Sequence, residues 1–170
     1  GLTGLLLGGY IEMHLRSMAV IAATTIIFGL LLGWADYRFR GSKTIEQLTW
    51  KSALVVGLAQ CLALIPGTSR SGITMTAALA LGFDRTAAAR FSFLLAIPII
   101  ALSGGYKGLQ LVNQDSVAWF EIVLGTFVSG ITAYLCIHSF LALVERVGML
   151  PFVIYRLVLG GTLIFILWNS

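Results

Sequence analysis

Charged residues are scarce in this sequence of 170 residues, where they make up 11%, with 7 acidic side chains against 11 basic ones. Average soluble domains carry about 25% charged residues. Hydrophobic residues reach 58%, and the mean hydropathy is +0.95. These values exclude a soluble domain. They predict a polytopic membrane protein of the all-α class, because long apolar runs cross a bilayer as helices.

Acidic residues are absent from the middle of the long apolar runs, since all 7 lie in loops or near the ends of those runs. Proton- and sodium-coupled transporters use such residues as relays, so this class of protein is disfavoured. No basic stretch interleaved with aromatic residues points to a nucleic-acid partner.

Cysteine and histidine are also rare. Cys61 and Cys136 lie in apolar runs, and we expect both to be small buried hydrophobic residues, not a disulfide or a metal pair. His14 and His138 have no partners at ligand spacing, so structural or interfacial roles are favoured for them. The sequence predicts no metal site from its own residues.

Four apolar runs are long enough, or nearly so, to cross about 30 Å of hydrocarbon as helices. They are residues 17–35, 91–106, 117–143 and 152–168. Residues 1–11 are too short for a span, and we expect them to be the end of an earlier helix. Residues 52–82 contain two shorter apolar pieces, one on either side of a polar loop at 66–72, so neither piece spans alone.

The basic residues favour a re-entrant hairpin over residues 52–82. If the chain turns back at the loop, seven basic residues share one side of the membrane and two the other; a chain running straight through divides them five against four. The seven are Arg38, Arg40, Lys43, Lys51, Arg85, Arg90 and Arg146, and the two are Arg16 and Lys107. The positive-inside rule prefers the larger imbalance. We therefore expect residues 36–51 and 84–90 on the cytoplasmic side.

The loop at 66–72 has the composition of an anion site. Three hydroxyl groups and one guanidinium follow one another between two glycines, in the order Gly67, Thr68, Ser69, Arg70, Ser71 and Gly72. Arginine offers a planar fork of donors that matches phosphate oxygens, and the N-terminus of a following helix adds free N–H groups. Small polar residues can instead serve only close packing and capping, but an arginine within a membrane segment favours a functional site.

A second arginine, Arg156, lies near the start of the last apolar run. Its place about one turn into that helix predicts a side chain that snorkels to the cytoplasmic surface. Contact with a lipid headgroup is the alternative interpretation.

Three segments carry a resemblance to a known family. Residues 64–72 read LIPGTSRSG, with Gln60 before and Thr74 after them, residues 90–98 read RFSFLLAIP, and residues 151–156 read PFVIYR. These segments resemble the bacterial undecaprenyl-diphosphate phosphatases, also called bacitracin-resistance proteins. The resemblance implies an architecture of inverted membrane repeats, in which the hairpin belongs to the second repeat. It also implies a first repeat that carries glutamates, serines and a histidine.

The resemblance implies hydrolysis of undecaprenyl (polyprenyl) diphosphate to the monophosphate and phosphate, which recycles the lipid carrier of cell-wall synthesis and gives bacitracin resistance. We expect catalytic roles for Arg70, Ser69 and Ser71. Substrate-binding roles are expected for Gly67, Thr68, Gly72, Thr74 and Gln60. A divalent cation, Mg²⁺ or Ca²⁺, is implied as well, with ligands from the first repeat and none identifiable in this chain.

The expected setting is the bacterial inner membrane, with a site that opens to the periplasmic side. The expected partners are a polyprenyl diphosphate and membrane lipids, and a homodimer is left open. A lipid-phosphate or anion transporter that uses the same loop for recognition without cleavage is the alternative function, because broken helices at mid-membrane suit both activities.

Overall fold

The computed structural model describes residues 17–39, 41–112 and 119–169, and this part of the chain is built from helices. The predicted helix end at 1–11 lies outside these residues, and so does His14. Within the described ranges no strand occurs, and an isolated bridge joins Lys43 and Phe83. The all-α class predicted from composition is confirmed.

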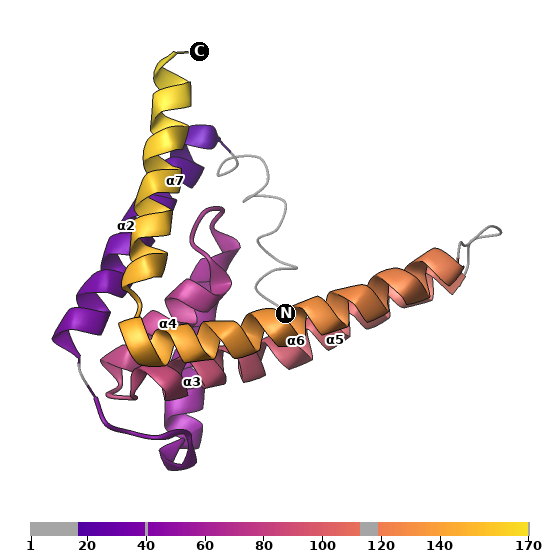
Figure 1. Ribbon diagram of the computed structural model, residues 1–170, viewed down its shortest axis with the longest axis horizontal. Coiled ribbons are helices and arrows are strands. Elements are labelled where there is room, and N and C mark those ends of the chain that lie inside the picture. The colour runs from indigo at the N-terminus through magenta and orange to yellow at the C-terminus, as the bar shows by residue number, and fades with distance from the viewer. Residues whose placement is uncertain (1–16, 40, 113–118, 170) are drawn as a thin grey trace.

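Four described helices are long and apolar enough to cross a membrane. They are α2 (Met18–Arg38), α5 (Arg85–Val112), α6 (Trp119–Val147) and α7 (Leu150–Trp168). Figure 1 shows α5 and α6 side by side as an arm that projects from the rest of the molecule, and α2 and α7 as a second pair. Helices α5 and α6 exceed the apolar stretches predicted for them, because helical structure continues through the polar residues at their ends.

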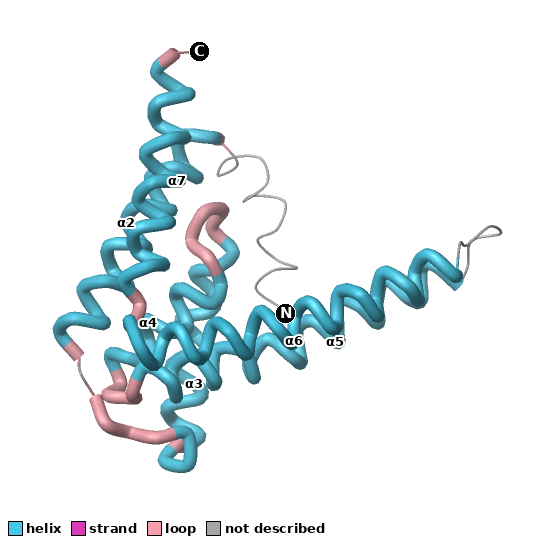
Figure 2. Tube along the Cα trace, viewed as in Figure 1, coloured by secondary structure: helices cyan, strands magenta, loops and turns pink. Residues whose placement is uncertain are grey.

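Two shorter helices lie between these pairs. Helix α3 (Trp50–Ala59) continues as the 3-10 helix η2 (Gln60–Leu64), and α4 (Arg70–Ala80) packs against both. The connection at 65–69 lies at one end of this unit (Figure 2). We call these connecting residues, with the first turn of α4, the anion loop (65–72).

At the other end of this unit, the chain that follows α4 bonds to the chain that precedes α3. The Lys43 N–H donates to the Gly82 carbonyl over 3.1 Å, and the Asp84 N–H donates to the Lys43 carbonyl over 2.9 Å. The chain before α3, which includes the short helix η1 (Ile45–Gln47), therefore lies beside the turn after α4. This arrangement is a helical hairpin, and its re-entry into a membrane stays a prediction.

Polar side chains define the helix starts. Ser17, Thr49 and Asp84 each accept a hydrogen bond from the backbone N–H three residues later, over 3.3, 3.2 and 2.7 Å. These bonds satisfy N–H groups that have no partner inside the helix, at the beginning of α2, α3 and α5. These three side chains thus specify where α2, α3 and α5 begin, and the starts of α3 and α5 bound the hairpin.

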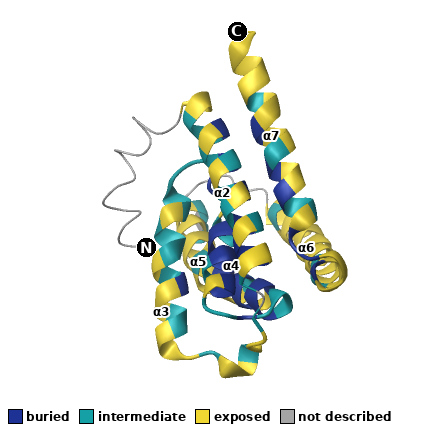
Figure 3. Ribbon diagram, turned by 90° about the vertical axis from the view of Figure 1, so that its left-hand side faces the viewer, coloured by how far each residue is buried: buried dark blue, intermediate teal, exposed yellow. Residues whose placement is uncertain are grey.

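The core surrounds α4, which is buried along most of its length (Figure 3). The largest fully buried apolar side chains of this core are Leu79 on α4, Phe83, Met149, Val56 on α3 and Val144 on α6. Most of α6 is exposed and apolar, as expected for a helix that faces lipid or another apolar partner.

A salt bridge ties the helices together at the base of the hairpin. Arg85 at the start of α5 donates to both carboxylate oxygens of Asp36 on α2, over 2.6 and 2.9 Å. The same carboxylate accepts a longer bond of 3.4 Å from the Met149 N–H, in the turn before α7. This charged pair therefore fixes α2, α5 and α7 relative to one another.

Glycines let α2 and α7 approach closely. A Cβ atom on Gly33 of α2 would lie 3.2 Å from Val153, and one on Gly160 of α7 would lie 2.4 Å from Ile26. Gly33 and Gly160 thus serve helix packing, as is usual for small residues in membrane helices. Helices α2 and α7 form the wall against which the anion loop rests.

Candidate functional site

The anion loop begins with a turn that few residue types can adopt. Gly67 has φ of +89°, which glycine tolerates because it has no Cβ. Ser69 has φ of +65° and is the one non-glycine residue in the described chain with a positive φ. A left-handed conformation costs an L-residue about 1–2 kcal/mol, and such strain clusters at functional sites.

The first turn of α4 presents unpaired backbone donors. The Ser69 hydroxyl caps the helix by accepting from the Gly72 N–H over 3.3 Å, and the Ser71 hydroxyl lies 3.5 Å from it. Within the described chain, the N–H groups of Arg70 and Ser71 have no acceptor, as is usual for the first residues of a helix. This end of α4 combines free donors, two hydroxyls and the positive end of the helix dipole, which suits an anion.

Arg156 of α7 reaches this loop, so the predicted snorkelling to the surface is wrong. Its side chain is only 7% exposed. Nη2 donates to the Gly67 carbonyl over 2.7 Å, and Nε donates to the Thr25 carbonyl of α2 over 3.2 Å. The physical reason is that hydrogen bonds to two carbonyls satisfy the guanidinium where it is buried, so the side chain does not extend to the membrane surface to reach water.

Two glycines make room for this arginine. A Cβ on Gly29 of α2 would lie 3.1 Å from the Cβ of Arg156, and a Cβ on Gly72 would lie 3.3 Å from its Nη1. Nη1 therefore faces the start of α4. It makes no hydrogen bond within the described residues, so it is available to a ligand there.

A cavity of about 400 Å³ opens beside the loop. Its polar end is formed by Ser69, Ser71, Gly72 and Arg156, together with Gly67 and Thr25. The rest of its lining is apolar or aromatic: Ile21, Leu32, Met75, Phe140, Phe152, Tyr155 and Leu159. One end of the cavity is thus cationic, and the remainder offers an apolar surface.

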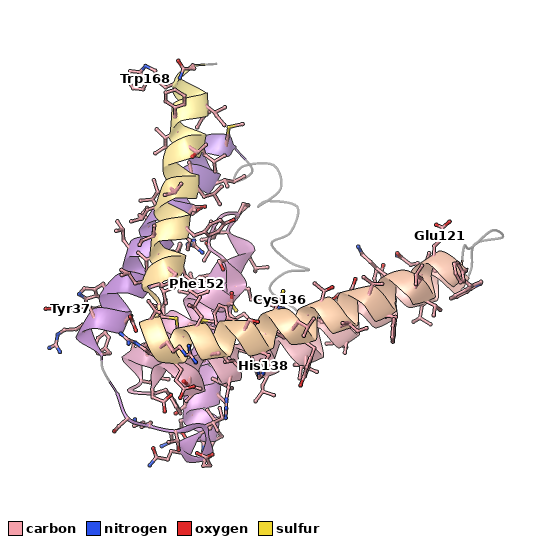
Figure 4. The ribbon with its side chains drawn as sticks, in the orientation of Figure 1. Tyr37, Glu121, Cys136, His138, Phe152 and Trp168 are labelled. Carbon is pink, nitrogen blue, oxygen red and sulfur yellow. The ribbon has the colours of Figure 1, made fainter. Side chains whose placement is uncertain are left out.

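The aromatic part of this cavity comes from the junction of α6 and α7, where Phe152 lies (Figure 4). The rings of Phe140 and Phe152 are 4.5 Å apart between centroids. Farther along α6, His138 stacks on Tyr134 with 6.4 Å between ring centroids. Cys136 is exposed, which corrects its predicted burial, because this stretch of α6 faces away from the described helices.

Four of the eight predicted site residues line the cavity, namely Gly67, Ser69, Ser71 and Gly72. Arg70 does not line it. The Arg70 guanidinium is half-buried and has no hydrogen bond or ion pair with any described residue. Only its backbone carbonyl is engaged, by the Thr74 hydroxyl over 2.9 Å.

Thr74 lies behind the loop and away from the cavity. It is 1% exposed, and its hydroxyl lies 2.7 Å from the Ser92 hydroxyl of α5. The hydroxyl is also within 3.1 Å of the Ser71 carbonyl. The structure therefore places Thr74 in the contact between α4 and α5, where it supports the loop from within the protein.

Gln60 and Thr68 contain buried polar atoms that lack a partner. Gln60 Oε1 and Thr68 Oγ1 form no hydrogen bond within the described chain, and Thr68 is 0% exposed. An unpaired buried polar group costs about 1–3 kcal/mol. A polar group from outside the described residues would therefore add most to stability or binding by forming a hydrogen bond with one of these two atoms.

The described residues do not fit a divalent cation. Among them, no group of three or more His, Cys, Asp or Glu side chains could hold a metal ion. The cavity lining supplies a guanidinium and hydroxyls but no carboxylate, whereas Mg²⁺ and Ca²⁺ prefer carboxylate oxygens. The expectation of a cation continues to rest on the resemblance alone.

A larger cavity of about 610 Å³ lies at the opposite end of the hairpin. Its lining includes Asp36, Asp84, Arg85, Arg90 and Glu145. The Asp36 and Arg85 charges already neutralise each other, and Asp84 caps α5. Arg90 and Glu145 are exposed, so among the described residues this cavity offers a ligand no free buried charge. The cavity beside the anion loop is therefore the better candidate.

The fold and this cavity define a class: a multi-pass membrane protein whose polar loop faces an apolar cavity between helices. The sequence comparisons identify the family within that class. A family model described as "Bacitracin resistance protein BacA" matches residues 1–162. The chain belongs to this family, which confirms the resemblance found in the sequence.

Curated relatives agree with this assignment. The chain is 62% identical over 168 residues to the "Undecaprenyl-diphosphatase" of Saccharophagus degradans, covering 99% of this chain and 63% of that protein. It is 58% identical over 170 residues to the protein of the same name from Thioalkalivibrio sulfidiphilus, covering 99% and 64%. "Undecaprenyl-diphosphatase 1" of Pseudoalteromonas translucida is 59% identical over 165 residues, covering 96% and 62%. The chain thus spans less than two thirds of the length of these relatives.

Proposed function

We propose that this chain provides the second half of the site of an undecaprenyl-diphosphate phosphatase. The observation that carries the proposal is the cavity beside the anion loop, which is polar and cationic at one end and apolar over the rest. An isoprenoid diphosphate has the same division between an anionic headgroup and an apolar tail. The proposed reaction is taken from the curated names of relatives that are 57–62% identical to this chain.

The anion loop binds the diphosphate in this proposal. The N–H groups of Arg70 and Ser71 and the hydroxyls of Ser69 and Ser71 donate to phosphate oxygens, and Nη1 of Arg156 supplies a buried positive charge. Arg70 has a guanidinium free of other bonds, so rotation about its side chain brings a second cation to the same oxygens. Phosphoryl transfer depends mainly on such positioning and charge neutralisation.

The reaction adds one water across the diphosphate bond. The water oxygen joins the terminal phosphorus, the bond from that phosphorus to the bridging oxygen breaks, and the bridging oxygen leaves with the lipid monophosphate. A general base must take the proton of the water. The described cavity lining contains no carboxylate or histidine, so we assign the base and the ligands of any Mg²⁺ or Ca²⁺ to the family's N-terminal repeat.

The cellular setting follows the same proposal. Hydrolysis at the periplasmic face of the inner membrane would return the lipid carrier to cell-wall synthesis and confer resistance to bacitracin. The family's description supports the resistance, because it names members as bacitracin resistance proteins. The basic residues of 36–51 and 84–90 support the orientation, and the hairpin brings these two segments together on one side.

The experiment compares two purified proteins in detergent. One is this 170-residue chain, and the other is the chain joined to the N-terminal repeat of a family member. Release of phosphate from undecaprenyl diphosphate is measured with and without Mg²⁺. We expect hydrolysis by the longer protein, and binding of diphosphate with turnover near background by the shorter one, because general acid–base help alone contributes about 10²–10⁴-fold.

Two outcomes overturn the proposal. Binding without cleavage by the longer protein favours a lipid-phosphate transporter. Full hydrolysis by the 170-residue chain shows that the base lies within it, and would move that role to Ser69, Ser71 or a histidine.

A further inference from the structure

We propose that Thr24 and Thr25 of α2 are positioning residues for the anion loop. Their hydroxyls hold the carbonyls of Pro66 and Gly67, and through them the start of α4. The inference rests on the proposed function for what the loop binds. The positioning itself is argued from hydrogen bonds alone.

The contacts are short and join distant parts of the chain. The Thr24 hydroxyl lies 2.6 Å from the Pro66 carbonyl, and the Thr25 hydroxyl donates to the Gly67 carbonyl over 3.2 Å. Both pairs are separated by 42 residues in sequence. Neither carbonyl belongs to a helix, so the bonds satisfy acceptors that secondary structure leaves unpaired.

Thr24 differs from three other helical threonines of this protein. Thr126, Thr132 and Thr162 each donate to the carbonyl four residues earlier, over 2.7, 2.8 and 2.9 Å, and reach no other element. The Thr24 hydroxyl has the same acceptor available, the Val20 carbonyl at 2.8 Å. A hydroxyl carries one proton, and the shorter distance to Pro66 directs that proton to the loop.

The two loop carbonyls are not equally dependent on α2. The Gly67 carbonyl also accepts from Arg156 Nη2 over 2.7 Å. Within the described residues, the Pro66 carbonyl has Thr24 as its partner and no other. Loss of the Thr24 hydroxyl should therefore affect the loop more than loss of the Thr25 hydroxyl.

The anion loop packs closely against α2 at Gly67. A Cβ on Gly67 would lie 2.2 Å from the Thr24 hydroxyl and 2.5 Å from the Ile21 carbonyl. Because C=O and N–H point in opposite directions in a trans peptide, anchoring these carbonyls to α2 turns the following N–H groups away from α2. The Pro66–Gly67 and Gly67–Thr68 peptide planes are set in this way, and only Thr68 and Ser69 separate them from the first residue of α4.

The first test follows the loop itself by amide hydrogen exchange of residues 65–73 in the full chain. Thr24→Val keeps the shape and removes the hydroxyl, Thr24→Ser keeps the hydroxyl, and Thr162→Val is the matched control. We expect exchange about five-fold faster in Thr24→Val, the ratio for one net hydrogen bond of about 1 kcal/mol. Thr25→Val should show a smaller increase, and the other two variants none.

The second test measures affinity for inorganic diphosphate and the melting temperature of the same variants. Thr24→Val should bind more weakly and Thr24→Ser should restore binding. The melting temperature of Thr24→Val should lie about 2–4 °C below that of Thr162→Val, the shift expected for one such hydrogen bond in a chain of this length. If Thr24→Val does not fold, Thr24→Ala takes its place.

Each result decides something. Exchange in Thr24→Val no faster than in Thr162→Val overturns the positioning role. Faster exchange with unchanged diphosphate affinity also overturns it, since the hydroxyl then orders the loop without serving the site. A wild-type chain that binds no diphosphate refutes the proposed function at this loop, while the exchange measurement still tests the contact with α2.

Discussion

Replacing Arg156 by lysine tests the assignment of this side chain to the anion loop. The substitution keeps the positive charge and most of the apolar stem. It removes the planar group whose Nε and Nη2 bond the Thr25 and Gly67 carbonyls over 3.2 and 2.7 Å. A lysine has a single nitrogen, which cannot occupy both donor positions.

The expected cost follows from these contacts. At least one hydrogen bond from a charged donor is lost in a site that is only 7% exposed, and such a bond contributes about 1.5–3 kcal/mol. For a chain of this length, 1 kcal/mol shifts the melting temperature by about 2–4 °C. We therefore expect Arg156→Lys to melt about 3–12 °C lower than the wild type, on the same scale.

Thermal unfolding in one detergent is the assay, with two lysine variants as controls. Arg146→Lys makes the same exchange at an exposed position near the end of α6 and should leave the melting temperature unchanged. Arg70→Lys should also leave it unchanged, because that guanidinium has no bonds in the described chain, yet it should abolish most phosphate release by the longer protein. Equal melting temperatures for Arg156→Lys and Arg146→Lys would refute the placement of Arg156 against the loop.

Three further outcomes are expected. Ser69→Gly should be at least as stable as the wild type, because relief of about 1–2 kcal/mol of backbone strain exceeds the few tenths of a kcal/mol lost with the helix cap. Ser69→Ala should lose about 1 kcal/mol of stability. Denaturant titration of both variants measures the difference. Gly160→Ala should lower the melting temperature, because overpacking costs about 1–3 kcal/mol of stability. Gly161→Ala should not lower it, because no neighbouring atom lies within 4 Å of the new methyl group. Single cysteines at Ser42 and Thr86, in a cysteine-free background, should react alike with an impermeant maleimide, and opposite labelling contradicts the hairpin topology.

The sequence was informative about the loop because its signal is local. Glycine, hydroxyl and guanidinium groups follow one another within a few residues, and the structure places Ser69, Ser71 and Gly72 together at one cavity. The helix after the loop begins at Arg70, inside the predicted loop 66–72, because the Ser69 hydroxyl caps it there.

Arg156 could not be assigned in the same way, because its partner Gly67 is 89 residues distant in sequence. The available signal was the one used for Arg70, an arginine within an apolar run, but its place near a helix start favoured snorkelling. The side chain of Thr74 could not be oriented from the sequence for a related reason. Its spacing after the loop says nothing about whether its hydroxyl faces the ligand or α5, and packing against Ser92 decided this.

The anion loop is held between the first and the last of the described helices, and this has a consequence for biosynthesis. Ribosomes deliver α2 before the hairpin, so the threonine hydroxyls are in place when the loop is made. The guanidinium that bonds the Gly67 carbonyl arrives only with α7. A nascent chain that has not yet released α7 lacks the Arg156 guanidinium at the loop, so until α7 joins it the loop is held to α2 by the threonine hydroxyls alone.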